Sequence, residues 1–302
     1  MPQAPREIRT CAEPLTLWRR HDLHAFLHGG TLRAEVEAGR LARLLVDPHL
    51  AKVLPSDRRV TVERHDDVVA RVVTSAYHRY VDEPLYALND VLEPFHGSCT
   101  PGAGRPPTRA RVLARLVELV GTPYLFGGTS ERGSSRQRDV LLELGTFAPH
   151  DLEHPELDRI ARAHGVDCSG LLNAATDGVF IGDSRDTVHL GPVVDLRDDT
   201  PPAEVARMLE PLDVLVWKGH MVVALGDGRI IQAVGDGTNA NAFFAECGGA
   251  PTAWQRYNRV AIDPARAILD ALSHRLGKRP SSQWPPSKDT YAIVRCGRSF
   301  QT

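Results

Sequence analysis

A cysteine, Cys168, stands where the sequence predicts the start of an apolar helix. Small and polar residues precede it in the segment Gly165–Leu172, as helix N-termini prefer, and leucine and alanine follow it. A thiol in that position lies near backbone amides and the positive end of the helix dipole, both of which favour the thiolate. Because the thiolate is the nucleophilic form of cysteine, we predict that Cys168 is a catalytic nucleophile.

Two polar side chains follow in a predicted β-hairpin. His220 opens the apolar run 220–225, and Gln232 is the only polar residue of the run 230–234. A cysteine nucleophile needs a base that takes its proton, and that base needs a group that orients it. We predict His220 as the base and Gln232 as the orienting group, on one sheet face. This requires an odd-numbered turn or a bulge between the strands, because a two-residue loop at Asp227–Gly228 would place them on opposite faces.

Length and charge bound the class of protein. The 302 residues suffice for one large domain or two modest ones. A formal net charge of −2, with basic residues scattered among acidic ones, argues against nucleic acid or an anionic membrane as the main partner. The sequence leaves the oligomeric state open.

The cysteines indicate a reducing environment. They are odd in number and far apart, which fits neither a disulfide framework nor a paired zinc-ligand pattern: Cys11, Cys99, Cys168, Cys247 and Cys296. Residues 1–7 lack the apolar core of a signal peptide, and no apolar run approaches the length that spans a bilayer. We therefore expect a cytoplasmic location, or export as an effector by a route that leaves no cleavable signal.

Several motifs occur in the order and character of one bacterial family. They are Tyr124–Gly128, Asp167–Leu171, Pro211–Trp217, Gly219–Gly228 and Ile230–Ala233. Through them, residues of about 109–262 resemble the NlpC/p60 family of papain-like cysteine peptidases, which cut cell-wall peptides. The resemblance implies an α+β fold in which a helix carries the cysteine against an antiparallel sheet. It also implies hydrolysis of a γ-D-glutamyl–diamino acid bond in a muropeptide-like peptide, or of another amide or ester, with no metal or cofactor.

The resemblance assigns further residues. It places Cys168, His220 and Gln232 in the catalytic positions, as expected above. Tyr124 matches a tyrosine whose hydroxyl helps to bind the oxyanion beside the Cys168 amide. Asp167 and Ser169 match positions that contact the amino end of the substrate in members that act on γ-D-glutamyl bonds.

The chain departs from the family pattern in two ways. The family's third catalytic position is usually histidine, where this chain has Gln232. Residues 130–164, which we expect to hold helices over 136–144 and 155–163, separate two motifs that the family keeps close together. This helical insert could cap a cleft, change the specificity or bind a partner, so the resemblance leaves the exact substrate open.

The domain organisation follows from composition and periodicity. We predict a small β-rich module over 1–100, with a helix over 31–45 and a hairpin of strands 59–64 and 68–73, then a strand within 77–88. This module faintly resembles the bacterial SH3-like domains that precede some cell-wall peptidases. After a Gly- and Pro-rich linker, residues 108–302 form the peptidase-like domain with the insert and a C-terminal extension over 263–302. Its predicted elements are helices over 108–120 and 264–276, and strands over 213–217, 220–225, 229–234, 257–262 and 290–295.

Other interpretations stay open. The same thiol could serve an acyltransferase or a deamidase, or the chain could be a non-catalytic binding module that keeps the fold. Gln232 could make a structural hydrogen bond, Tyr124 could simply pack, and Asp167 could cap the helix. His150 and His154 have a spacing that metal ligands sometimes show, but Pro149 and Pro155 argue against a shared helical face.

Overall fold

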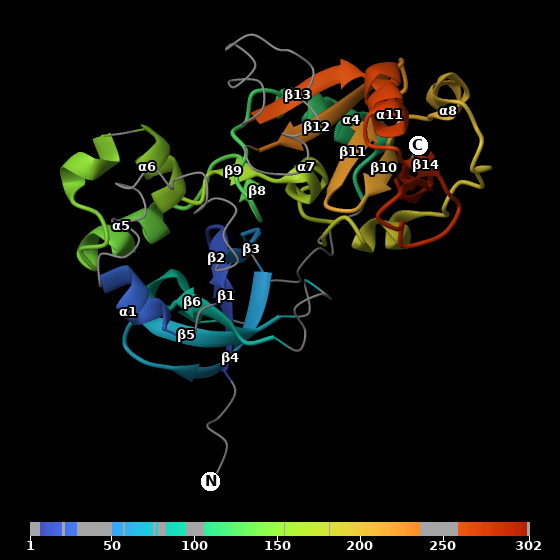
Figure 1. Cartoon of the computed structure of the whole chain (residues 1–302). Coiled ribbons are helices and arrows are strands. Elements are labelled where there is room, and N and C mark those ends of the chain that lie inside the picture. The colour runs from blue at the N-terminus through green and yellow to red at the C-terminus, as the bar shows by residue number, and fades with distance from the viewer. Residues whose placement is uncertain are drawn as a thin grey trace. The chain divides into compact units, whose positions relative to one another are not determined.

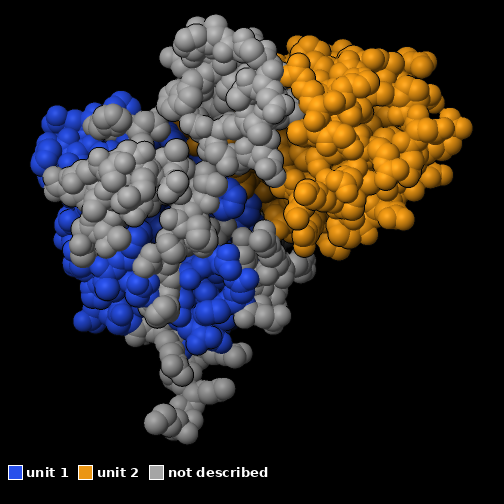
Figure 2. All heavy atoms as spheres, in the orientation of Figure 1, with its two compact units in different colours: residues 1–103, 125–165 blue, residues 104–124, 166–302 orange. Residues whose placement is uncertain are grey.

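The computed structural model describes residues 7–19, 22–28, 50–56, 58–74, 77, 83–94, 106–153, 155–180, 182–235 and 259–300. The chain divides into two compact units, coloured separately in Figure 2. Unit 1 comprises Met1–Ala103 and Leu125–Gly165, and unit 2 comprises Gly104–Tyr124 and Val166–Thr302. The predicted helix over 31–45 lies outside the described residues.

The described part of unit 1 contains a seven-stranded sheet of antiparallel pairs, in the order β3-β2-β6-β5-β4-β1-β7. Its strands are β1 (Glu7–Cys11), β2 (Leu15–Trp18), β3 (Leu50–Leu54), β4 (Arg58–His65), β5 (Val69–Val73), β6 (Leu85–Leu88) and β7 (Glu93–Pro94) (Figure 1). The predicted hairpin is β4–β5, where Asp66 accepts the amides of Val68 and Val69 at 2.8 and 2.6 Å. A β-rich module is therefore present, whereas its SH3-like identity stays a prediction.

Shorter elements complete this sheet. Helix α1 (Leu23–His28), which the sequence did not predict, buries Leu23, Phe26 and Leu27, and η2 (Asn89–Val91) follows β6. Part of the strand expected over 77–88 is present as β6, and residues 78–82 lie outside the described residues. Tyr77 instead donates from its buried hydroxyl to the Val53 carbonyl at 2.9 Å.

The predicted helical insert belongs to unit 1. It holds β8 (Thr129–Ser130), α5 (Ser135–Glu143), η3 (Pro149–Glu153) and α6 (Pro155–Ala161). Glu13, in the loop after β1, accepts hydrogen bonds from the Ser134 hydroxyl, the Ser135 hydroxyl and the Arg136 amide at 2.8, 2.6 and 2.8 Å. A carboxylate at a helix N-terminus satisfies amides that have no partner within the helix. This long-range contact ties the insert to the N-terminal sheet, whereas we had expected the insert within the domain over 108–302.

The described part of unit 2 contains a six-stranded sheet in the order β13-β12-β11-β10-β15-β14. Its strands are β10 (Asp213–Trp217), β11 (His220–Ala224), β12 (Arg229–Val234), β13 (Arg259–Pro264), β14 (Arg279–Pro280) and β15 (Thr290–Arg295). All pairs are antiparallel except β14 with β15. The segment expected as a C-terminal extension thus supplies β15, which pairs with β10 inside the sheet. The molecule combines α and β elements with mainly antiparallel sheets.

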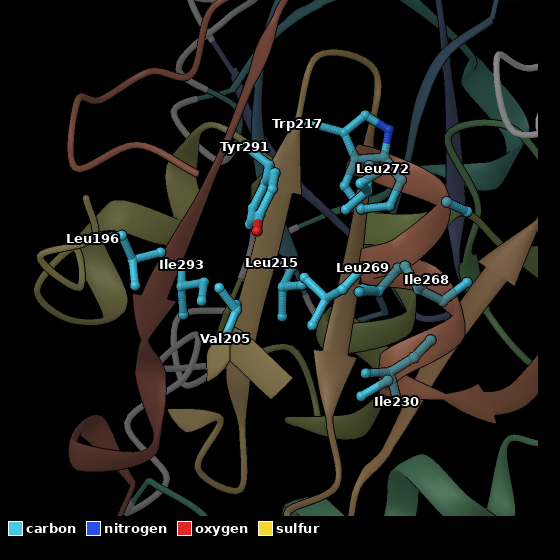
Figure 3. Close-up of a cluster of buried hydrophobic side chains, with 13 residues drawn as sticks. Leu196, Val205, Leu215, Trp217, Ile230, Ile268, Leu269, Leu272, Tyr291 and Ile293 are labelled. Atoms are coloured by element: carbon cyan, nitrogen blue, oxygen red, sulfur yellow. The ribbon is translucent and has the colours of Figure 1, made fainter. Parts of the chain in front are cut away.

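Helices cover this sheet because they carry apolar stripes. They are α4 (Arg109–Glu118), α7 (Cys168–Ala175), α8 (Pro202–Met208) and α11 (Ala265–His274), with β9 (Gly165–Val166), η4 (Asp186–Leu190) and η5 (Cys296–Ser299) as short connections. Figure 3 shows Leu269 of α11 beside Leu215 of β10, within a buried cluster that also includes Ile230 of β12. Each fully buried side chain of this size contributes about 1.5–3 kcal/mol to folding. None of the helices among the described residues is long and apolar enough to cross a membrane.

Candidate active site

Cys168 is the first residue of α7, as predicted. Asp167 precedes it as the N-cap, with extended backbone, and its carboxylate accepts the Gly170 amide at 2.6 Å and the Ser169 hydroxyl at 2.8 Å. Asp167 and Ser169 are both buried, while Cys168 is partly exposed. The capping interpretation of Asp167 is therefore correct, and contact of Asp167 or Ser169 with substrate stays a prediction.

The position of α7 follows from its apolar side. Leu171, Leu172 and Ala175 are fully buried, and the helix contacts α4, β11 and β12. Packing against β11 and β12 brings the helix that carries the thiol to the two strands that carry His220 and Gln232. Burial of the aliphatic side chains thus positions the polar ones.

The turn between β11 and β12 decides which face Gln232 occupies. Val223 pairs with Ile231 and Ala224 with Ile230, and the Leu225 amide donates to the Arg229 carbonyl at 2.9 Å. The loop is therefore the three residues 226–228, in which Gly226 and Gly228 adopt φ of +88° and +78°. Glycine allows this left-handed backbone at low cost. An odd loop keeps His220 and Gln232 on one face, as predicted, and the two-residue alternative is wrong.

A chain of hydrogen bonds fixes the state of the imidazole. His220 Nε2 lies 3.1 Å from Gln232 Oε1, and Gln232 Nε2 donates to Asp263 Oδ2 at 2.9 Å. Because a carboxylate only accepts hydrogen bonds, the amide NH₂ must face Asp263 and the amide oxygen must face the ring. The imidazole therefore carries its proton on Nε2 and keeps a lone pair on Nδ1.

Burial keeps this imidazole neutral. His220 is 4% exposed, and its burial lowers its pKa from 6.5 to about 4. The hydrogen bond with Gln232 and the negative charge of Asp167 act in the opposite direction and are weaker. At neutral pH the ring is consequently a base that is ready to accept a proton.

Tyr124 is buried beside the start of α7. Its backbone bridges to Val166, and the Val166 amide donates to the Pro123 carbonyl at 3.0 Å. Burial raises the pKa of Tyr124 well above 10, and the charges of Cys168 and Asp167 raise it further. The phenol therefore stays protonated and remains a hydrogen-bond donor.

The Tyr124 ring packs directly against the backbone of Gly235. A Cβ atom built on Gly235, which follows β12, would lie 2.2 Å from both Cδ1 and Cε1 of Tyr124. That separation is far below van der Waals contact, so position 235 has no room for a side chain while Tyr124 keeps this position.

The structure brings the six predicted residues into unit 2. The charge of Asp167 acts on both Tyr124 and His220, which places the tyrosine and the imidazole within electrostatic reach of the same helix start. Two further residues, Asp263 and Gly235, escaped the sequence analysis. Asp263 is an acid at the end of a predicted strand, but only the pairing of Ile230 with Asp263 in β12–β13 shows that it meets Gln232.

The remaining candidates are the other cysteines and the two histidines considered as metal ligands. Among the described residues, no three histidine, cysteine, aspartate or glutamate side chains gather in a way that could hold a metal ion. His154, Cys99 and Cys247 lie outside the described residues. Cys296 is buried, and burial raises the pKa of its thiol, so it is a poor nucleophile.

Comparisons with known proteins find likenesses among solved structures only. No protein-family model matches the chain, and no curated protein matches it. Several solved structures of NlpC/P60 proteins resemble it. An NlpC/P60 family protein from Bacillus cereus ATCC 10987 is 14% identical over 85% of this chain, with a TM-score of 0.30, and the match spans 58% of that protein.

Two more solved structures show the same kind of likeness. The P60 domain of an antigen from M. avium subspecies paratuberculosis is 20% identical, with 52% of this chain and 84% of that one covered and a TM-score of 0.27. NlpC2 from Trichomonas vaginalis is 13% identical, with 96% and 72% covered and a TM-score of 0.29. Scores of this size do not establish a shared fold, and we base the function on the geometry of the site.

Proposed function

We propose that this chain is a cysteine hydrolase in which Cys168 attacks an amide carbonyl. The observation that carries the proposal is the hydrogen-bonded series His220, Gln232 and Asp263, which leaves Nδ1 of a neutral imidazole as the base. A polar series of this kind, in which His220 and Gln232 are buried and Asp263 is partly buried, is costly in an inert core and typical of a functional site.

The first half-reaction forms a thioester. The Cys168 proton passes to His220 Nδ1 as Sγ bonds to the carbonyl carbon, and the carbonyl oxygen becomes an oxyanion. The Tyr124 hydroxyl and the Cys168 backbone amide donate to that oxygen. The imidazolium then gives its proton to the leaving nitrogen, the carbon–nitrogen bond breaks, and an amine departs.

The second half-reaction hydrolyses the thioester. His220 Nδ1 removes a proton from water as the water oxygen attacks the acyl carbon. The oxyanion forms again, the carbon–sulfur bond breaks, and the proton returns to the sulfur. The products are a carboxylic acid and the free enzyme, and no oxidant, metal or cofactor enters the balance.

The motif resemblance supports a peptide substrate of the muropeptide type, with a γ-D-glutamyl–diamino acid bond as the scissile amide. The papain-like arrangement of a helix-borne cysteine and a strand-borne histidine is part of this proposal. Transfer of the acyl group to an amine instead of water is the competing outcome of the experiment.

The test uses the tripeptide L-Ala-γ-D-Glu-meso-diaminopimelate with the full chain and mass-spectrometric detection of products. We expect the wild type to release free diaminopimelate, and the Cys168→Ala variant to be at least about 10³-fold slower. Added glycine methyl ester should yield little adduct if water is the acceptor. Full activity in Cys168→Ala would refute the proposal. A dominant adduct with glycine methyl ester would show that the enzyme is a transferase and not a hydrolase.

Thiol labelling gives a second test that needs no substrate. A thiol with a neutral base beside it should react with iodoacetamide at pH 7 faster than free cysteine does. Peptide mapping separates Cys168 from the buried Cys11 and Cys296 in the same sample. The His220→Gln variant should bring the rate at Cys168 back to that of free cysteine.

A further inference from the structure

Lysine is rare in this chain and concentrated in one place. The 36 basic residues include only four lysines, and three of them, Lys218, Lys278 and Lys288, belong to unit 2. The Lys278 ammonium donates to the backbone carbonyl of Lys288. The pKa of Lys278 is lowered, first by burial and then by the positive charges of Lys288 and Lys218, while Asp289 opposes the shift. Three lysines remote in sequence thus lie within electrostatic reach of one another.

Two of these lysines line a hollow of about 250 Å³. Lys218 belongs to the turn between β10 and β11, Lys288 follows Pro285 and Pro286, and Arg185 enters from the segment before η4. The lining includes no aspartate or glutamate. Within the part of the chain that the structure describes, the side chains of Arg185, Lys218 and Lys288 make no hydrogen bond or ion pair.

Such an arrangement favours an anion. Arg185, Lys218 and Lys288 are exposed, so water screens their repulsion, but around a concave surface they create a positive potential that attracts negative charge. Elsewhere in unit 2, basic side chains pair with acids, as Arg266 does with Asp270 at 2.7 Å and Arg295 with Glu210 at 2.7 Å. No described residue forms such an ion pair with the cations of the hollow, which is the observation that points to a negatively charged ligand.

The hollow adjoins the candidate active site. Trp217 lines it and pairs with His220 across β10–β11. The two rings meet edge to face, with centroids 5.0 Å apart and planes at 65°. A ligand held in the hollow is therefore one side chain away from the imidazole.

We propose that this hollow binds a carboxylate-bearing residue of the peptide substrate, with the carboxylate among Arg185, Lys218 and Lys288. This proposal rests on the proposed hydrolase function, whose substrate it describes more closely. Trp217, Pro285 and Pro286 would contact the methylene groups that lead to the carboxylate. An inorganic anion such as phosphate would gain nothing from contact with these apolar side chains. The volume of the hollow suits an amino-acid side chain together with part of its backbone.

Binding to the Cys168→Ala full chain tests the pocket without catalysis. The probes are N-acetyl-glutamate N-methylamide, its glutamine isostere and inorganic phosphate, and the readout is the indole NMR signal of Trp217, assigned with Trp217→Phe. We expect the glutamate probe to shift that signal saturably and to bind about fivefold more tightly than the glutamine probe, which is the upper end of the range for an exposed ion pair. Equal binding of glutamate and glutamine, tighter binding of phosphate, or no binding would overturn the proposal.

Charge variants locate the carboxylate. Lys218→Gln and Arg185→Gln should each weaken the glutamate probe about fivefold, and Arg185→Lys should keep most of its affinity. Arg298→Gln removes one exposed charge of unit 2 outside the hollow and serves as the matched control. Thermal melting of each variant verifies that it is folded.

The two proposals fail separately. Probe binding without hydrolysis by the wild type would refute the hydrolase and leave the pocket. Hydrolysis at equal kcat/KM for peptides in which each acidic residue in turn carries a carboxylate or a carboxamide would refute the pocket and leave the hydrolase.

Discussion

The side-chain amide of Gln232 donates to the Asp263 carboxylate at 2.9 Å, across the pair β12–β13. This contact orients the amide, and the amide in turn orients His220 at 3.1 Å. Asp263 is thus a positioning residue that acts on His220 through one intermediary, Gln232, whereas in a Ser-His-Asp triad the buried acid contacts the histidine directly.

Removal of the Asp263 charge should weaken catalysis without abolishing it. In Asp263→Asn the new amide can donate as well as accept, so Gln232 can rotate and present its NH₂ to the ring. We expect kcat/KM to fall about tenfold, equivalent to the loss of one hydrogen bond of about 1.4 kcal/mol. Asp270→Asn removes an acid of the same unit that pairs with Arg266 and not with Gln232, and it is the control. An unchanged rate and pH profile in Asp263→Asn would show that the contact is structural only.

Activity should persist to a lower pH than is usual for an enzyme with a histidine base. The pKa of His220 is lowered to about 4, so the neutral base persists at pH values where an ordinary histidine, with pKa 6.5, is protonated. We expect kcat/KM to rise with pH through about 4 and to be level from about pH 6. A profile of initial rates from pH 3 to 8 measures this, and an acid limb centred near 6.5 would contradict it.

The same group should make stability depend on pH. Between pH 6.5 and about 4 the unfolded chain binds a proton at His220 and the native chain does not, so the free energy of unfolding falls as the pH falls. A shift of this size corresponds to about 3 kcal/mol over the whole window. Urea denaturation at several pH values should show the slope, and His220→Gln should flatten it.

The sequence predicted unit 2 better than unit 1. Strands β10, β12 and β15 have the predicted bounds, because their central residues are buried: 213–217 in β10, 230–234 in β12 and 291–294 in β15. Periodicity cannot show which strands become neighbours, so β15 was taken for part of an extension, although it pairs with β10. The contact of the insert with Glu13 was not predicted for the same reason, because Glu13 and Ser134 are 121 residues apart in the sequence.

The site was predictable where a local signal exists. A helix start identifies Cys168, and an apolar strand with one polar residue identifies Gln232. The length of the β11–β12 loop was harder to predict. Gly226, with φ of +88°, belongs to the loop together with Asp227 and Gly228, and this third loop residue places His220 and Gln232 on the same face of the sheet. Asp263 and Gly235 have no such signal, because each matters only through a contact with a residue far away in the sequence.

Gly235→Ala should impair catalysis by displacing Tyr124. The added methyl would stand 2.2 Å from two ring carbons, so the ring must move away from its place beside the start of α7. If the hydroxyl binds the oxyanion, kcat should fall about 10²-fold, as for the loss of one such donor, and Tyr124→Phe should fall by a similar factor. The two changes combined should cost no more than either alone, since they remove the same interaction.

A control for the glycine is available in the same unit. Gly277→Ala has open space around the new methyl but places alanine at φ of +59°, so it should lower stability by about 1 kcal/mol and leave kcat unchanged. Normal kcat in Gly235→Ala, with the folded state verified by melting, would contradict the assigned place of the ring.

Glu13 should hold the insert to the N-terminal sheet of unit 1. Its carboxylate accepts three hydrogen bonds at the start of α5, and these lower its pKa although burial acts to raise it. Glu13→Ala removes a cap and should cost about 1 kcal/mol, seen as faster hydrogen exchange of the α5 amides.

Because the pKa of Glu13 is lowered in the folded state, its contribution to stability is present near neutral pH and is lost as the carboxylate is protonated in acid. Glu143→Gln, at the other end of α5, removes the same charge from a helix C-terminus, where a negative charge is unfavourable, and should not speed exchange. Equal protection of α5 in Glu13→Ala and the wild type would show that other contacts hold the insert.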